Sequence, residues 1–116
     1  MEPVYLTAGI PKSSWYRWLG KLILAEKDSR GRYQLSPREA GLARIAGALH
    51  KLGIREPQLA PLLGRLRELA PRDRAELVEN LVVVQTGRRT YSFFDSADEV
   101  PQIEPIAIYF LKELLG

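Results

Sequence analysis

Apolar side chains recur every three or four residues in three stretches of the chain, the spacing that places them on one face of an α-helix. The first stretch predicts a helix from about Lys12 to Leu22 with the apolar face Trp15, Trp18, Leu19 and Leu22. The second predicts a helix with the core positions Leu42, Ile45, Ala46, Leu49 and Leu52. The third predicts a helix that buries Leu59, Leu62, Leu63, Leu66 and Leu69. Both tryptophans are therefore expected in the core.

Prolines, glycines and a capping sequence set the predicted ends of these helices. Ser36-Pro37-Arg38-Glu39 is a capping box, because its serine hydroxyl and its glutamate carboxylate can each accept a hydrogen bond from a free amide of the first turn. Gly53 ends the helix that begins there. Pro57 opens the next helix, which ends before Pro71. Two shorter helices are predicted, Val4 to Ala8 and about Arg72 to Asn80.

Two segments with turn residues at their centres predict β-hairpins. The first extends from Ile23 to Leu35 and has Gly31 in its turn. The second joins Leu81–Gln85 to Thr90–Phe94. Each hairpin follows a predicted helix, so the strands are expected to pair locally.

The last segment is unusually apolar. Pro105 is expected to begin a helix, Ile106 to Leu115, that carries apolar groups on nearly all sides. One small domain covers only part of such a helix, so four of its residues are predicted to form a homodimer interface: Ile106, Tyr109, Phe110 and Leu114. The alternative is that the helix is internal. The expected fold is mainly α with two β-hairpins (α+β), with a first domain over residues 1–70 and a hairpin-and-helix region over residues 71–116.

Composition excludes several kinds of chemistry. The 116 residues include no cysteine and one histidine, which rules out disulfides, thiolate metal sites, cysteine nucleophiles and zinc sites built from histidines. His50 has no recognisable catalytic partner and is expected to be a structural or surface histidine. The acids Asp95, Asp98, Glu99 and Glu104 lack a metal-binding pattern. We therefore expect no enzyme activity, cofactor or metal. Without a bilayer-spanning apolar run or a signal-like N-terminus, the protein is expected to be cytoplasmic.

Charge is divided unevenly along the chain. Residues 1–72 hold 13 Lys or Arg and 6 Asp or Glu, a net +7, whereas residues 73–116 hold 4 and 8, a net −4. A basic half beside an acidic half indicates that the first half meets a polyanion. The alternative is two solvated surfaces with an uneven distribution of charge.

The basic residues gather on two predicted elements. An α-helix fits the major groove of DNA, so Arg17 on the polar face of the first helix is expected to reach a guanine or a phosphate. Cations at the tip of the adjoining hairpin suit phosphates or the minor groove. The predicted DNA-binding residues are Lys12, Ser13, Tyr16, Arg17, Lys21, Lys27, Arg30 and Arg32. The alternative is an ordinary amphipathic helix and a soluble turn.

Six short motifs follow one another at spacings typical of one family. They are Gly9-Ile10, Ser13-Ser14-Trp15-Tyr16-Arg17-Trp18, Leu22-Ile23-Leu24, Gly31-Arg32-Tyr33, Ser36-Pro37-Arg38-Glu39 and Leu52-Gly53-Ile54. In this order, residues 4–63 resemble the DNA-binding domain of MerR-family transcription regulators. The resemblance implies a winged helix-turn-helix and a palindromic promoter site. It does not extend to the long dimerisation helix of that family, because Pro71 interrupts the segment.

Together these features favour sequence-specific binding of double-stranded DNA by a transcription regulator that acts as a homodimer. One alternative is an excisionase-like or chromosome-organising protein, which uses a similar winged module for DNA architecture. Another is a protein-interaction module, such as an antitoxin or adaptor, in which the apolar C-terminal half binds a partner.

Overall fold

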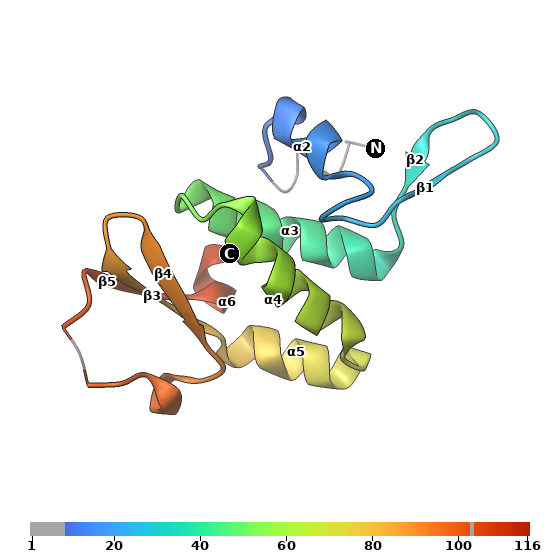
Figure 1. The fold of residues 1–116 in the computed structure, drawn as a ribbon. Coiled ribbons are helices and arrows are strands. Elements are labelled where there is room, and N and C mark those ends of the chain that lie inside the picture. The colour runs from blue at the N-terminus through green and yellow to red at the C-terminus, as the bar shows by residue number, and fades with distance from the viewer. Residues whose placement is uncertain (1–8, 103) are drawn as a thin grey trace. The chain divides into compact units, whose positions relative to one another are not determined.

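The computed structural model describes residues 9–102 and 104–116, an α+β fold with five α-helices and two small β-sheets in that part of the chain (Figure 1). Contacts between Cα atoms group the chain into two units, residues 1–67 and 68–116. The helix predicted at residues 4–8 lies outside the described residues. No helix in the described ranges has both the length and the apolar character needed to cross a bilayer.

The first described helix, α2, spans Lys12–Trp18 and is shorter than predicted. The chain leaves the helix at Leu19, which is extended (φ −61°, ψ 128°), and Gly20 then turns it with a φ of 81°, a left-handed conformation that glycine takes without steric cost. The carbonyl oxygen of Trp18 then accepts three amides at 3.0, 2.9 and 3.1 Å, from Lys21, Leu22 and Ile23. Leu22 is still buried, but it lies in this turn and not on the helix.

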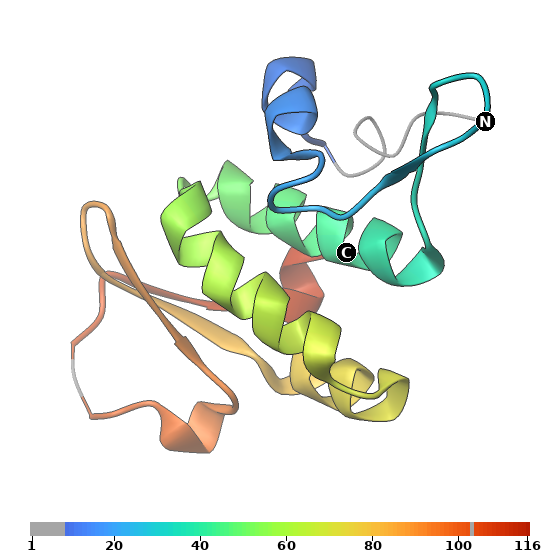
Figure 2. The same ribbon diagram turned by 45° about the vertical axis from the view of Figure 1, so that its right-hand side comes forward.

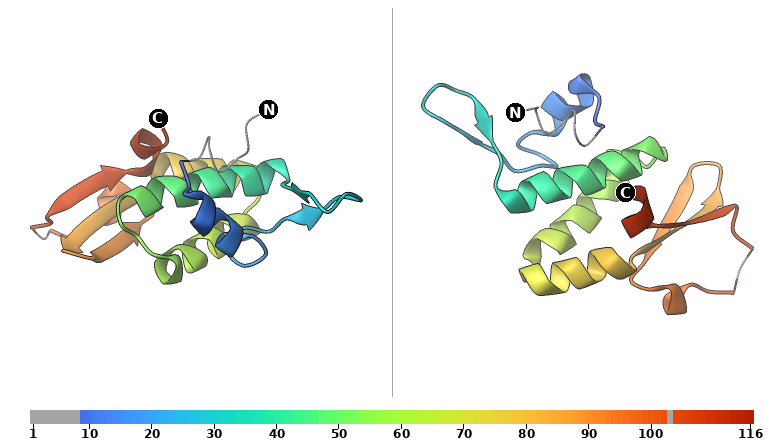
Figure 3. Two further views of the ribbon diagram at one scale, coloured as in Figure 1. Left: turned by 90° about the horizontal axis from the view of Figure 1, so that it is seen from above. Right: turned by 180° about the vertical axis from the view of Figure 1, so that it is seen from behind.

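A short hairpin follows the turn, as predicted. Its strands, β1 (Glu26–Lys27) and β2 (Tyr33–Gln34), pair antiparallel. The paired part is only two residues long on each side, and all four residues are exposed. Both views in Figure 3 show the hairpin extending away from the helices of its own unit. The paired residues of this hairpin therefore add little to the core.

Two longer helices complete the first unit. α3 spans Pro37–Lys51 and α4 spans Glu56–Glu68, with a tight turn between them in which Gly53 has a φ of 99° (Figure 2). Ser36 caps α3 with its hydroxyl, as predicted. The predicted helical faces of α3 and α4 are largely confirmed by the buried residues Leu42, Ile45, Ala46, Leu49, Leu59, Leu62, Leu63 and Leu66. Leu52 and Leu69 are half-buried and lie just beyond these helices.

The second unit begins with α5 (Pro71–Asn80) and continues into the predicted second hairpin, β3 (Val82–Gly87) and β4 (Thr90–Phe94). Val82, Val83 and Val84 are all buried, and because successive side chains of a strand point to opposite faces, β3 is covered on both faces at this end. A short 3₁₀-helix, Ala97–Glu99, follows β4. The sheet has the order β4-β3-β5, so β3 has a neighbour on each side.

The predicted final helix is wrong. The segment forms strand β5 (Ala107–Phe110), antiparallel to β3, and only then a single helical turn, α6 (Leu111–Leu114). The amide of Ile106 donates to Gln85 at 2.8 Å and that of Leu111 to Leu81 at 3.1 Å, which extends the pairing beyond both ends of β5. A short run rich in β-branched and aromatic residues suits either element by its apolar pattern alone, and the open edge of β3 decided in favour of the strand.

Candidate nucleic-acid interface

α2 has a polar face and a buried face. Lys12, Ser13, Tyr16 and Arg17 are exposed, and the side chain of Arg17 is 56% exposed. Trp15 and Trp18 are buried, which confirms the prediction that both belong to the core. The helix therefore presents its polar residues to solvent from a firmly packed base.

The prediction that Lys21 lies on the polar face of the first helix is wrong. Lys21 lies in the turn after α2, because the helix ends at Trp18, and its side chain is exposed. The other three predicted cations are exposed on the hairpin: Lys27 in β1, Arg30 at the tip and Arg32 just before β2. All eight predicted DNA-binding residues are thus exposed, on α2, the turn that follows it and the β1–β2 hairpin.

The hairpin tip is organised by Asp28, a residue that sequence analysis did not single out. Its Oδ1 atom accepts the amides of Arg30 and Arg32 at 2.8 and 2.9 Å, and its Oδ2 atom lies 3.3 Å from the Arg32 Nε atom. The amide of Arg32 is the main reason that the pKa of Asp28 lies below its ordinary value of 3.8. An aspartate before a turn commonly binds amides two residues on, which is the signal that would have identified it.

The hairpin cations differ in how they are held. The Lys27 Nζ atom lies 5.2 Å from the centroid of the Tyr33 ring, within the range of a cation–π contact. Arg32 pairs with Asp28. Among the described residues, the side chain of Arg30 has no ion-pair or hydrogen-bond partner, so it is the most available of the three.

Arg17 is held by Glu56, in the first turn of α4. The Arg17 Nε and Nη2 atoms lie 2.7 and 2.6 Å from the Glu56 Oε1 atom. The indole N–H of Trp18 donates to the same oxygen at 2.8 Å. Burial favours the neutral acid, but these hydrogen bonds and the charge of Arg17 outweigh it and lower the pKa of Glu56 below its ordinary value of 4.5. Sequence reasoning missed this contact, since no local pattern connects residues 39 positions apart.

A second carboxylate, Glu39, holds the base of the hairpin. It is only 2% exposed and accepts the amide of Leu24 at 2.8 Å and the Arg67 Nη2 and Nε atoms at 2.7 and 2.9 Å. Arg38 adds a contact at 3.1 Å. Burial opposes the charged form, but the bonds from Arg67 and Leu24 lower the pKa of Glu39. The predicted capping box is therefore half confirmed: Ser36 accepts the Glu39 amide, while the carboxylate serves this network instead.

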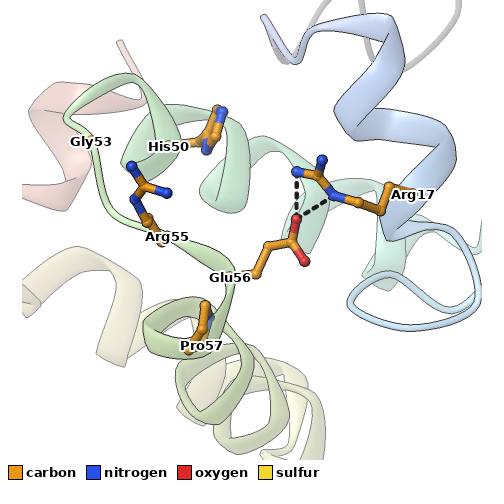
Figure 4. A pocket seen from close by; sticks show the side chains of 6 residues that line it. All are labelled: Arg17, His50, Gly53, Arg55, Glu56 and Pro57. Carbon is orange, nitrogen blue, oxygen red and sulfur yellow. Dashed lines mark hydrogen bonds and ion pairs between the residues drawn. The ribbon is translucent and has the colours of Figure 1, made fainter.

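A hollow of about 500 Å³ opens beside Arg17 (Figure 4). Its lining residues are Arg17, His50, Gly53, Arg55, Glu56 and Pro57. The His50 ring meets the Trp18 ring edge-on at 5.2 Å, and its buried Nδ1 atom has no hydrogen-bond partner in the described part of the chain. His50 thus packs against the base of α2, while two guanidinium groups and one carboxylate supply the charge of the hollow.

The residues predicted as a dimer interface do not share a helix. Ile106 precedes β5, Tyr109 and Phe110 lie in β5, and Leu114 is in α6. Ile106, Ile108 and Phe110 are 64%, 46% and 37% exposed, whereas Tyr109 and Leu114 are half-buried. Alternate residues of a strand point to opposite faces, so the exposed apolar side chains form one row and Tyr109 belongs to the other face.

Within residues 9–102 and 104–116 there is no group of three or more histidine, cysteine or acidic side chains placed to hold a metal ion. Comparison with known proteins found no matching family model, no matching curated protein and no matching solved structure.

Proposed function

We propose that the first unit binds double-stranded DNA, with α2 in the major groove and the β1–β2 hairpin against the neighbouring backbone. The observation that carries the proposal is the charge of residues 12–34: six Lys or Arg and two acids, a net +4, with all six cations exposed. One of the two acids, Asp28, is occupied in shaping the tip. A surface of this kind attracts a polyanion by releasing its counterions.

The two elements have different roles in this proposal. Arg17 and Tyr16, near the end of α2, face base edges, while Lys12, Ser13 and Lys21 hold phosphates on either side. Arg30 and Arg32 bind the backbone or enter the minor groove. We propose that this arrangement is a winged helix-turn-helix, an interpretation that the resemblance of residues 4–63 to MerR-family domains supports.

The test is the salt dependence of binding to a labelled duplex, measured by fluorescence anisotropy. We expect the logarithm of affinity to fall linearly with the logarithm of salt concentration, with a slope of about −0.9 for each phosphate neutralised. Arg30→Ala and Lys21→Ala should each make the slope shallower by about 1. Arg88→Ala, an exposed arginine between β3 and β4, is the matched control and should leave it unchanged. A flat salt response of the unmodified protein would end the proposal.

We further propose that binding is sequence-specific and serves transcription regulation. Selection of bound fragments from genomic DNA distinguishes this role from its alternatives. A recovered palindrome supports a regulator that binds as a two-fold dimer. Bound fragments without a shared sequence, bent on binding, indicate an architectural or excisionase-like role. If no DNA fragment is enriched over the input and the second unit binds a protein partner, the chain acts as an adaptor.

For the second unit we infer that two copies of the chain associate through β5. This strand lies at the edge of its sheet and carries no charged residue, and edge charges are a common means of preventing such pairing. Antiparallel pairing of β5 with a second β5 continues both sheets and brings together the exposed row of Ile106, Ile108 and Phe110. Sedimentation of the unmodified protein tests this, and a monomer with and without DNA contradicts it.

A further inference from the structure

The contact between Glu56 and Arg17 does more than pair two charges. A guanidinium group has five N–H donors arranged along edges in one plane. Two of these, on Nε and Nη2, are directed at the single Glu56 Oε1 atom, 2.7 and 2.6 Å away. The edge that joins Nε to Nη2 is therefore occupied, whereas the edge that joins Nη1 to Nη2 has no further partner among the described residues.

The carboxylate of Glu56 is itself held in place by the indole ring of Trp18. The oxygen that accepts from Arg17 also accepts the indole N–H of Trp18 at 2.8 Å, and Trp18 is fully buried. A buried ring thus anchors the carboxylate, and the carboxylate orients the guanidinium. Figure 4 shows both dashed contacts on one side of Arg17 and its third nitrogen pointing away from Glu56.

The available edge has a definite chemical match. Two parallel N–H donors of an arginine fit the O6 and N7 acceptors of guanine in the major groove, and this is the commonest specific contact between proteins and DNA. An arginine that is already oriented loses less side-chain entropy on binding than a free one. The Arg17 side chain remains 56% exposed, so the ion pair does not hide it.

We propose that Glu56 is a positioning residue that turns Arg17 into a reader of guanine. This inference rests on the proposed function, since it concerns how the same interface recognises a base. It has an unusual consequence for charge. Glu56 repels the phosphate backbone, so its removal should strengthen binding to unrelated DNA while it weakens the choice of base.

The experiment is selection of bound duplexes from a random pool, with affinities then measured for the best site and for an unrelated duplex. We expect the unmodified protein to prefer guanine at one position and Arg17→Ala to lose that preference. Glu56→Gln should reduce the preference at this position about tenfold. It should leave other positions unchanged and should tighten binding to the unrelated duplex. The double variant with Glu56→Gln and Arg17→Ala should discriminate between bases as well as Arg17→Ala alone does, because Glu56 acts only through Arg17 in this proposal.

Two controls separate positioning from general effects. Glu68→Gln removes an exposed acid from the other end of α4, so it should leave the guanine preference intact. Arg17→Lys keeps Glu56 and the positive charge but has no planar fork, so it should lose the preference while it keeps the salt dependence. If Glu56→Gln proves poorly folded by circular dichroism, this second variant still tests the guanidinium edge on which the proposal depends.

The outcomes distinguish the two proposals. If the unmodified protein binds no duplex, the proposed function fails, and the role of Glu56 falls with it. If the unmodified protein binds and selects guanine but Glu56→Gln selects it equally well, the proposed function stands and the positioning role is overturned. Retention of the preference by Arg17→Lys would likewise overturn the role of the guanidinium edge.

Discussion

The guanidinium of Arg67, in the last turn of α4, binds both carboxylate oxygens of Glu39, in the first turn of α3, at 2.7 and 2.9 Å. The same Arg67 Nη2 atom donates to the carbonyl oxygen of Leu22 at 3.0 Å, and Glu39 accepts the amide of Leu24. The pair thus connects both long helices to the segment between α2 and the hairpin. The relative placement of the two proposed DNA-binding elements depends on this contact.

Removal of Arg67 should be costly. Arg67→Ala leaves the Glu39 carboxylate buried without its main partner, so we expect a loss of about 3 kcal/mol in the free energy of unfolding. Urea denaturation followed by circular dichroism measures it. Arg38→Ala is the matched control, because Arg38 contacts the same carboxylate from an exposed position, and it should cost less than about 1 kcal/mol. Equal losses in the two variants would contradict the role assigned to Arg67.

Acid should weaken the fold through the same carboxylate. The pKa of Glu39 in the folded chain lies below 4.5, its ordinary value, so the unfolded chain binds a proton first as the pH falls. The stability from this group is fully present above the unfolded pKa and is lost as the pH falls through the folded pKa. Urea midpoints measured from about pH 6 to about pH 3 should therefore fall more for the unmodified protein than for Glu39→Gln. Parallel curves for the two proteins would disprove this origin of acid sensitivity.

Two glycines should respond to alanine in opposite directions. Gly20 has a φ of 81° and open space around its missing Cβ atom, so Gly20→Ala meets backbone strain alone and should cost about 1 kcal/mol. Gly41 lies within α3, also in open space, and Gly41→Ala should stabilise by about 0.5 to 1 kcal/mol. Thermal unfolding compares the two variants. A gain in stability from Gly20→Ala would show that α2 is able to continue past Trp18.

A charge on β5 should block the proposed self-association. Ile108 is 46% exposed, so Ile108→Lys should change the free energy of unfolding by less than about 0.5 kcal/mol while it places like charges opposite one another in paired strands. Analytical ultracentrifugation should then show a monomer. Thr90→Lys puts the same charge on β4, the opposite edge of the sheet, and should leave the association unchanged. If both variants behave like the unmodified protein, the interface lies elsewhere.

Periodicity was a good guide wherever a pattern was long enough. α3 and α4 each bury apolar residues at helical spacing over about two turns, and local signals lie at the start of α3 in Ser36 and after its end in Gly53. These features depend on residues close together in sequence, so they can be predicted without a tertiary structure. The exposure of Lys12 and Arg17 followed in the same way, because the apolar residues of α2 occupy its other face.

The predictions of secondary structure were wrong where the local sequence was compatible with two conformations. The residues of β5 are apolar on every side, which is compatible with a helix or a strand, and the unpaired edge of β3 supplied the hydrogen bonds that favour a strand. α2 ends because Leu19 is extended, and the amides of the following turn then donate to the Trp18 carbonyl oxygen. Neither preference is visible in the spacing of apolar residues.

Local sequence patterns were enough to predict helices α2 to α5, the two hairpins and the concentration of positive charge in residues 12–34. The pairing of β5 with β3 and the contacts of Glu39 with Arg67 and of Glu56 with Arg17 were not predictable in this way. The two groups of features differ in the separation, along the chain, of the residues that interact. Helical faces and turns result from interactions between near neighbours, whereas a strand partner or a buried carboxylate is chosen by groups that only folding brings within hydrogen-bond distance.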